Sequence, residues 1–253
     1  MNKLSVSIIT AMILVYTPIG RATLTEGLVG YWSFDDWANP ARDDSGNGHD
    51  GTVHGATWTT GKFGGALSFD GMRDYVSVPD DAALNILGDL TISAWVYLTR
   101  TGSYQAIVTK CVGSGRQNNP FDFRTTWNAE PDLALVRADA VAHERVYGSV
   151  ALAMDQWYHV SVRVENNIPD FYVNGFITPK YADTTFTRTP TGNANPLLIG
   201  SRDGGLYFNG LIDEVRIYNR ALSGSEIMAL VPEPATLLLV SLGSLGLFRR
   251  RRA

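Results

Sequence analysis

The stretch LTISAWVYL at residues 90–98 alternates between two kinds of side chain. Successive side chains of an extended chain point to opposite faces. One face here would carry only apolar groups, from Leu90, Ile92, Ala94, Val96 and Leu98. The other face would carry Thr91, Ser93, Trp95 and Tyr97. This alternation predicts a strand with two unlike faces, as in one sheet of a two-layer β-sandwich.

The segment WYHVSVRV at residues 157–164 has the same alternation. Its apolar face would hold Tyr158, Val160, Val162 and Val164, and its polar face Trp157, His159, Ser161 and Arg163. It predicts a second strand of the same kind. We expect His159 on the polar face to be an ordinary hydrogen-bonding residue at the surface.

Two Asn-Gly pairs lie between apolar runs, at residues 174–175 in DFYVNGFIT and at residues 209–210 in LYFNGLIDEVRIY. Both positions of such a pair tolerate a positive φ, so each pair predicts a hairpin turn and antiparallel strands. One short helix is marked in LSGSEIMAL, where Ser223 and Glu226 have the spacing of a capping box. The fold expected is therefore all-β, with one short C-terminal helix.

Residues 1–22 have the layout of a secretory signal peptide. A lysine at position 3 precedes an apolar run of about 13 residues, and Gly20 and Ala22 form a small-x-small cleavage pattern. A permanent anchor would want roughly 20 apolar residues. The sequence therefore predicts export, with cleavage after Ala22.

The net charge excludes some partners. The chain has 21 Lys and Arg against 25 Asp and Glu, but six of the basic residues and one acidic residue lie in the two terminal segments. The body between them has a net charge of about −9. Such a body repels phosphate backbones, so we expect no nucleic-acid partner. The single cysteine, Cys111, excludes an intrachain disulfide framework and a zinc site with several thiolates.

Residues 231–253 form a tripartite tail. It begins with Pro232, Glu233 and Pro234, continues as an apolar run over residues 235–248, and ends with Arg249, Arg250, Arg251 and Arg252. The run is short for a membrane-spanning helix, and the arginines would hold its end in the cytoplasm. The tail resembles the PEP-CTERM sorting signal of Gram-negative-type bacteria. The resemblance implies a transient inner-membrane anchor, processing by an exosortase-type protease, and delivery to the cell surface or extracellular matrix. A plain tail anchor is the alternative.

Residues 23–230 resemble the LamG-like, concanavalin A-type jelly-roll domains. The match is carried by GLVGYWSFDD at residues 27–36, LSFDG at residues 67–71 and IDEVRIYNRALS at residues 212–223. The resemblance implies a single sandwich of two curved antiparallel sheets. It also implies a structural Ca²⁺ near the meeting of the first and last strands, at Asp35 or Asp36 together with Asp213. Alternatively, Asp213 could pair with Arg216.

A second possible calcium site comes from the residues themselves. DDSGNG at residues 43–48 places oxygen side chains at Asp43, Ser45 and Asn47, like the first half of a calcium loop. A turn held together by side-chain hydrogen bonds is an equal alternative.

Catalytic residues are not predicted. Glycoside hydrolases on this architecture need two carboxylates flanking the scissile bond. The nearest pattern is EPDLAL, with Glu130 and Asp132 in place, but Ala134 and Leu135 stand where a second glutamate belongs. Glu130 is therefore expected in a loop. A divergent hydrolase or lyase stays open as the alternative function, as does a purely structural matrix protein.

The function expected first is binding of carbohydrate or a protein partner by an exported, non-catalytic protein. Aromatic side chains stack on sugar rings, and Trp95, Tyr97 and Trp157 occupy the polar faces of two predicted strands. The loop at residues 113–122 offers hydrogen-bonding side chains at Arg116, Gln117 and Asn118. Packing under a loop could explain the aromatic residues equally well, and the polar loop could be an ordinary surface loop.

Overall fold

A computed structural model describes residues 24–111, 117–181, 185–202 and 205–231 of the chain. The predicted signal peptide, the Pro-Glu-Pro and arginine positions of the tail, and Arg116 lie outside the described residues. Within the described ranges, no helix is long and apolar enough to cross a membrane.

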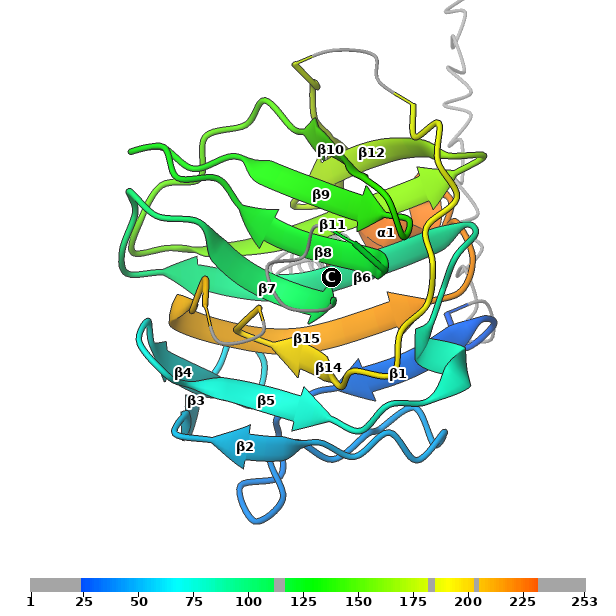
Figure 1. The fold of residues 1–253 in the computed structure, drawn as a ribbon. Coiled ribbons are helices and arrows are strands. Elements are labelled where there is room, and N and C mark those ends of the chain that lie inside the picture. The colour runs from blue at the N-terminus through cyan, green and yellow to red at the C-terminus, as the bar shows by residue number, and fades with distance from the viewer. Residues whose placement is uncertain (1–23, 112–116, 182–184, 203–204, 232–253) are drawn as a thin grey trace, which may run out of the picture.

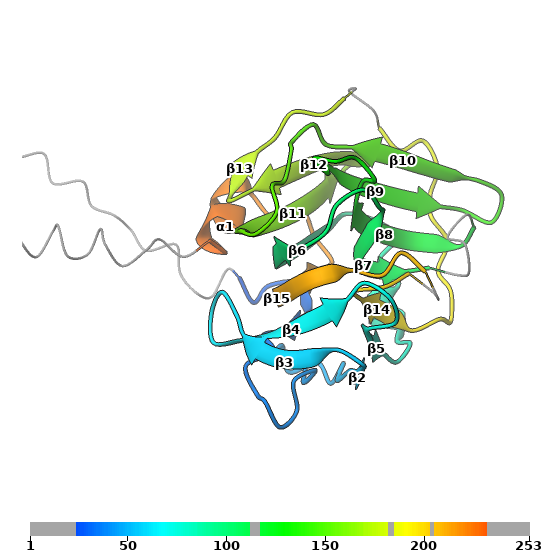
Figure 2. The ribbon, with the colours of Figure 1, turned by 90° about the vertical axis from the view of Figure 1, so that its left-hand side faces the viewer.

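Two antiparallel sheets face each other as the layers of a sandwich (Figures 1 and 2). The eight-stranded first sheet runs in the order β13 (Phe176–Ile177), β12 (Ile168–Val173), β11 (Trp157–Glu165), β6 (Leu90–Leu98), β15 (Asn209–Tyr218), β4 (Gly65–Asp70) and β3 (Thr57–Thr60), with β1 (Leu28–Trp32) also paired to β15. The seven-stranded second sheet runs in the order β10 (His143–Tyr147), β9 (Leu133–Ala138), β8 (Asn119–Thr125), β7 (Gln105–Lys110), β14 (Leu197–Ile199), β5 (Tyr75–Val78) and β2 (Thr52–His54). The all-β prediction is confirmed.

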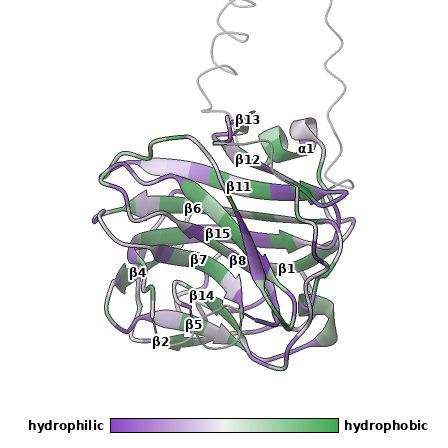
Figure 3. Cartoon of the chain, turned by 45° about the horizontal axis from the view of Figure 1, so that its top comes forward, coloured by the Kyte–Doolittle hydropathy of each residue, from purple (hydrophilic) through white to green (hydrophobic). Residues whose placement is uncertain are grey.

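The core fills the space between the two sheets. The apolar faces predicted for β6 and β11 are buried there, including Leu90, Val96 and Val162. The second sheet contributes Phe121 and Phe123 of β8 among others. Hydrophobic and hydrophilic residues alternate along many of the strands (Figure 3). Burial of these apolar faces drives the two sheets together.

The short helix α1 (Gly224–Ala229) packs on the outer face of the first sheet, over part of β12 and β15. The predicted capping box is present, because the Ser223 side chain accepts from the Glu226 backbone and the Glu226 side chain accepts from the Ser223 backbone. Ile227 of the helix packs against Tyr172 of β12 and Tyr218 of β15 in a small second core. A short 3₁₀ turn, η2 (Ala82–Leu84), precedes β6. The buried residues of both cores lie between residues 29 and 230, so the sandwich has its own hydrophobic interior.

The two Asn-Gly pairs have different roles. Asn174 and Gly175 both have positive φ and form the turn between β12 and β13, as predicted. The prediction at Asn209 and Gly210 is wrong, because these residues begin β15 and pair with β4 and, at Gly210, also with β6. Gly210 has φ 138, and a Cβ there would lie 2.0 Å from the Tyr97 carbonyl oxygen. Glycine is needed here for a close backbone approach.

Candidate functional site

A groove lined by aromatic side chains lies where β8 ends and β7 and β9 begin. These three strand ends meet at one end of the second sheet (Figure 1). Two cavities of 540 and 250 Å³ form it and share Tyr104 and Trp127. Tyr207 lines the larger cavity, and Tyr147 and Tyr181 line the smaller one. We call these five rings and the space between them the aromatic groove.

The rings of the aromatic groove come from chain segments that only the fold brings together. Tyr104 precedes β7, Trp127 follows β8 and Tyr147 ends β10. The side chains of Trp127 and Tyr181 are exposed, at 61% and 64% of their full surface. Two exposed rings beside a cavity form a surface on which a flat, partly apolar ligand can stack.

A buried carboxylate lies at the base of the aromatic groove. Asp132 is 4% exposed, and its Oδ2 accepts a hydrogen bond from the Tyr181 hydroxyl at 2.7 Å and from the Asn128 amide at 3.3 Å. The hydrogen bond to Asp132 raises the pKa of Tyr181, so the phenol stays a neutral donor. This arrangement fixes the Tyr181 ring and presents polar groups next to it.

The EPDLAL pattern at residues 130–135 contributes Asp132 to the aromatic groove but no second carboxylate. Glu130 lies in a bend outside the strands, is exposed, and lines neither cavity. It is a loop residue, as expected. Among the described residues that line the aromatic groove, Asp132 is the only carboxylate.

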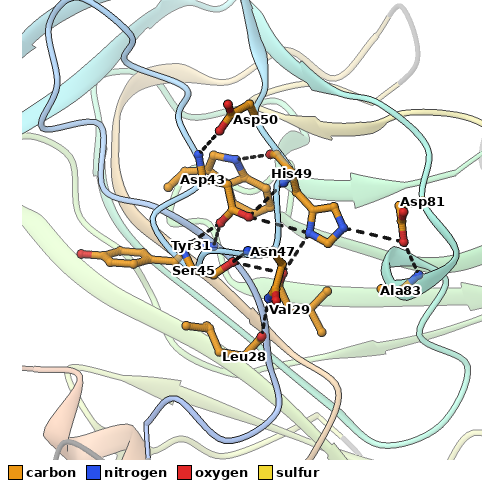
Figure 4. Close-up of polar contacts among 11 residues, drawn as sticks. Leu28, Val29, Tyr31, Asp43, Ser45, Asn47, His49, Asp50, Asp81 and Ala83 are labelled. Carbon is orange, nitrogen blue, oxygen red and sulfur yellow. Dashed lines mark hydrogen bonds and ion pairs between the residues drawn. The ribbon is translucent and has the colours of Figure 1, made fainter.

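Hydrogen bonds hold the loop at residues 43–48 together and tie it to β1 (Figure 4). Asp43 accepts from three backbone N–H groups, those of Tyr31 at 3.0 Å, Ser45 at 2.9 Å and His49 at 3.0 Å. Burial alone would raise the pKa of Asp43, but these hydrogen bonds and one from the Ser45 side chain outweigh it and lower the pKa. The Asn47 amide nitrogen donates to the carbonyls of Leu28 and Val29 at 2.9 Å. We therefore assign Asp43 and Asn47 to holding the loop.

Asp35 and Asp213 lie on either side of the turn at residues 61–65. Oδ1 of Asp35 accepts from the Gly65 N–H at 2.8 Å, and Oδ2 of Asp213 accepts from the Phe63 N–H at 3.0 Å. Oδ1 of Asp213 is buried and has no hydrogen-bond partner. Burial, with the nearby carboxylates of Glu214 and Asp35, raises the pKa of Asp213 to about 7.

Asp35 and Asp213 are better suited to bind a hard cation than the residues of the loop at residues 43–48. A buried carboxylate oxygen without a partner and a second carboxylate nearby are oxygen ligands of the kind Ca²⁺ takes. The alternative partner, Arg216, forms its ion pair with Glu214 instead, at 2.5 Å. No group of three or more His, Cys, Asp or Glu side chains in the described ranges could hold a metal. Backbone carbonyls or water would therefore have to complete any shell around Asp35 and Asp213.

Trp95 is buried, and its predicted role as an exposed stacking surface is wrong. The residue is 5% exposed because the turn at residues 61–65 closes over its ring. The Lys62 ammonium lies 4.9 Å from the ring centroid, and the Phe63 ring packs edge-on at 5.6 Å. His159, paired across from Trp95, is also fully buried, which lowers its pKa to about 3. The prediction of His159 as a surface residue is therefore wrong too.

The remaining predicted ligand residues lie in separate places. Tyr97 and Trp157 are partly exposed neighbours on the outer face of the first sheet, with ring centroids 5.7 Å apart. Gln117 and Asn118 precede β8, at the opposite end of that strand from the aromatic groove. Asn118 accepts from the Thr191 hydroxyl at 2.7 Å. The structure does not bring these two groups together.

Sequence reasoning missed the aromatic groove. Its rings lie in turn-rich segments such as TTWNAEPD at residues 125–132, where no alternation marks a face. The available signal was the number of aromatic residues outside the predicted strands.

Comparison with known families gives two matches. The family model for the concanavalin A-like lectin/glucanases superfamily matches residues 70–228. The model for the PEP-CTERM protein-sorting motif matches residues 230–252.

Individual proteins are similar to this chain at low identity. Adhesion G-protein coupled receptor V1 of Danio rerio is 27% identical over 179 residues, which are 67% of this chain and 3% of that receptor. Domain 4 of AbnA, a GH43 extracellular arabinanase from Geobacillus stearothermophilus in complex with arabinotriose, is 23% identical with a TM-score of 0.63, over 81% of this chain and 98% of that domain. The binding domain of Botulinum neurotoxin DC, in complex with rat synaptotagmin II, is 13% identical with a TM-score of 0.61, over 82% of this chain and 51% of that one. The structural likenesses establish a shared fold.

Proposed function

The chain belongs to the concanavalin A-like lectin/glucanases superfamily, and from this premise we propose that its body is a non-catalytic module that binds an oligosaccharide in the aromatic groove. The observation that carries the proposal is the pair of exposed rings, Trp127 and Tyr181, beside the buried Asp132. Exposed rings offer faces for sugar rings, and the polar groups around Asp132 offer partners for hydroxyls.

The alternative is glycoside hydrolysis in the same groove. That chemistry uses two carboxylates, roughly 5–10 Å apart, flanking the scissile bond. Asp132 is the one carboxylate among the described lining residues, and it already accepts two hydrogen bonds. The groove therefore supports binding better than hydrolysis. The arabinotriose complex of the AbnA domain and the synaptotagmin complex of the toxin domain are consistent with glycan or protein ligands on this fold.

The tail supports a proposal on location. The chain carries a PEP-CTERM protein-sorting motif at residues 230–252. We propose that the motif holds the exported chain briefly at the inner membrane of a Gram-negative-type bacterium. An exosortase-type protease would then process Pro232, Glu233 and Pro234 and release the body to the cell surface or matrix.

We also propose a structural Ca²⁺ at Asp35 and Asp213. The support is the unpartnered buried oxygen of Asp213 and the mutual repulsion of the carboxylates, which a divalent cation would relieve. The ion would hold the turn at residues 61–65 against β15. Asp43 and Asn47 are not part of this proposed site, since their hydrogen bonds hold the loop at residues 43–48 together and tie it to β1.

Trp127→Ala tests the proposed function. Residues 23–231, which contain the whole sandwich, would be titrated calorimetrically with arabinotriose and with a panel of neutral and acidic oligosaccharides. We expect the variant to bind the best ligand at least tenfold more weakly, about 1.4 kcal/mol, because a stacking ring is lost. Trp37→Ala is the matched control, since Trp37 is 75% exposed and lines neither cavity.

Two results would contradict the proposal. If both variants bind as the unaltered protein does, the ligand does not lie in the aromatic groove. If new reducing ends appear with time in the unaltered protein, the groove catalyses hydrolysis and the alternative is correct.

A further inference from the structure

Guanidinium groups gather at the aromatic groove, although the body as a whole is strongly acidic. Arg100 is exposed and lines the larger cavity. Arg124 lies 4.9 Å from the centroid of the Tyr104 ring, which lines both cavities. Arg145 is exposed and donates to the Tyr147 hydroxyl at 3.3 Å. Each of these three arginines therefore either lines the groove or contacts one of its rings.

The strand register places further charged side chains beside the groove, on one face of the second sheet. Residues paired directly across neighbouring strands share a face. Arg124 pairs with Ala134, which pairs with Tyr147. One row further along, Asp122 pairs with Val136, which pairs with Arg145. The outer face of β8, β9 and β10 therefore carries Asp122, Arg124, Arg145 and Tyr147 side by side.

One acidic group lies among these arginines on the sheet. Asp122 is fully buried and forms ion pairs with Arg124 at 3.0 Å and with Arg202 at 3.6 Å. No carboxylate of the described residues lies within ion-pair distance of Arg100 or Arg145. With Asp132 at the base of the groove counted, this region holds two carboxylates. It holds four arginines, namely Arg100, Arg124, Arg145 and Arg202. The groove and the adjoining sheet face therefore have an excess of positive charge.

Several side-chain polar atoms of Asp122, Arg124 and Arg202 have no hydrogen-bond partner. They are Oδ1 of Asp122, Nε of Arg124 and Nε of Arg202, all buried in the described part of the chain. Buried polar groups in proteins are nearly always hydrogen-bonded, so unpartnered ones indicate a place where water or a small ion completes the arrangement. Arg124 itself is 5% exposed and held in place by Asp122 and Tyr104.

We propose that the ligand of the aromatic groove is an anionic glycan, whose carboxylate or sulfate groups are bound by Arg100 and Arg145. This inference rests on the proposed function, because it names the class of oligosaccharide that the groove takes. Guanidinium groups form paired hydrogen bonds with carboxylate and sulfate-like oxygens. The acidic remainder of the body repels such a ligand from other surfaces and favours encounter at the groove.

Matched charged and neutral glycans test the inference on residues 23–231. One pair is tri-galacturonate and its fully methyl-esterified form, and the other is sulfated and unsulfated dextran. We expect at least tenfold tighter binding of a charged member over its neutral partner at 50 mM salt, with the preference shrinking as salt is added. The two pairs distinguish a carboxylate ligand from a sulfate ligand.

A double variant, Arg100→Gln with Arg145→Gln, separates charge from stacking. It should lose at least tenfold in affinity for the preferred charged glycan and less than twofold for the neutral partner. Arg188→Gln is the control, because Arg188 is an exposed arginine paired with Asp139 at the other end of β9. It should change neither affinity, and thermal unfolding would check that all variants are folded.

The outcomes of the two proposals differ. Equal affinity for charged and neutral partners, or a double variant that binds charged glycan normally, overturns the anionic ligand and leaves the proposed function standing. Binding of none of the four glycans by the folded protein overturns the anionic ligand, and failure across the whole oligosaccharide panel overturns the proposed function as well.

Discussion

His159 is held neutral inside the protein, since burial lowers its pKa to about 3. An unfolded histidine has a pKa near 6.5, so between about pH 3 and pH 6.5 the unfolded state binds more protons than the folded state. The stability that His159 contributes is therefore complete above about pH 6.5 and is lost as the pH falls towards 3. Lowering the pH from 7 to 5 should cost about 2 kcal/mol of unfolding free energy from this group.

His159→Gln tests this origin of acid sensitivity. Urea unfolding curves would be measured for both proteins from pH 4 to pH 8. The variant removes the titrating ring, so its unfolding free energy should change less between pH 7 and pH 5. Identical pH profiles would mean that His159 is protonated without cost, which contradicts its burial against Trp95.

At single positions, strand alternation predicted faces correctly but could not predict what covers them. Leu90, Ile92 and Val96 point into the core as expected. Trp95 points away from the core as expected, yet the turn at residues 61–65 buries it from the other side. That turn lies about 30 residues upstream, and its contact with Trp95 depends on how β3 and β4 pair with the sheet. Local periodicity contains no information on such a contact.

At the scale of elements, β15 depends on Gly210. The strand pairs with β4 and β6 at this residue, and an added methyl group would meet the Tyr97 carbonyl oxygen at 2.0 Å. Gly210→Ala must shift the backbone of a central strand, so we expect a loss of ~3 kcal/mol or more. The thermal midpoint should fall by roughly 6–12 °C in differential scanning calorimetry.

Gly224→Ala is the matched control for Gly210→Ala. Gly224 begins α1, has no positive φ, and its added methyl group would meet nothing within 4 Å. Alanine also favours helix over glycine by up to ~1 kcal/mol. The midpoint of this variant should stay unchanged or rise slightly. Equal losses in both variants would refute the close approach at Gly210.

Both Asn-Gly pairs were predicted to form turns, and only the pair at residues 174–175 does. The dipeptide reports only that a positive φ is tolerated, which both a turn and an irregular strand can use. Asn174 makes the turn with β13, whereas Asn209 donates from its side chain to the Asp70 carbonyl at 2.6 Å and is held in the strand. The tertiary partner, not the dipeptide, decides between the two. The capping box of α1 was predictable because its two partners, Ser223 and Glu226, are only three residues apart.

At the scale of the whole molecule, the fold was predictable and the aromatic groove was not. The sandwich follows from alternation repeated along many strands, so a local error such as Asn209 does not change the outcome. The groove depends on a few rings at positions 104, 127, 147, 181 and 207, each in or beside a loop. Their meeting requires the pairing of β7, β8, β9 and β10, which no short pattern specifies.

The proposed Ca²⁺ would tie together three distant segments, at Asp35, residues 61–65 and Asp213. At ten times its dissociation constant, Ca²⁺ should add about 1.4 kcal/mol to the stability of residues 23–231 and raise the thermal midpoint by roughly 3–6 °C. In chelator, the raised pKa of Asp213 makes its contribution fall as the pH rises from about 4 to about 7, so the gain from Ca²⁺ should be larger at pH 8 than at pH 6.

Two variants decide between the two candidate calcium positions. Asp213→Asn should abolish the Ca²⁺ response in differential scanning fluorimetry, because the unpartnered carboxylate oxygen is replaced. Asp43→Asn should lower the midpoint by weakening its loop, yet keep the full response, because both Asp43 carboxylate oxygens already accept from backbone N–H groups there. The reverse pattern would place the ion in the loop at residues 43–48. No response in the unaltered protein would refute the ion altogether, and the carboxylate of Asp213 would then be expected to hold a proton below about pH 7.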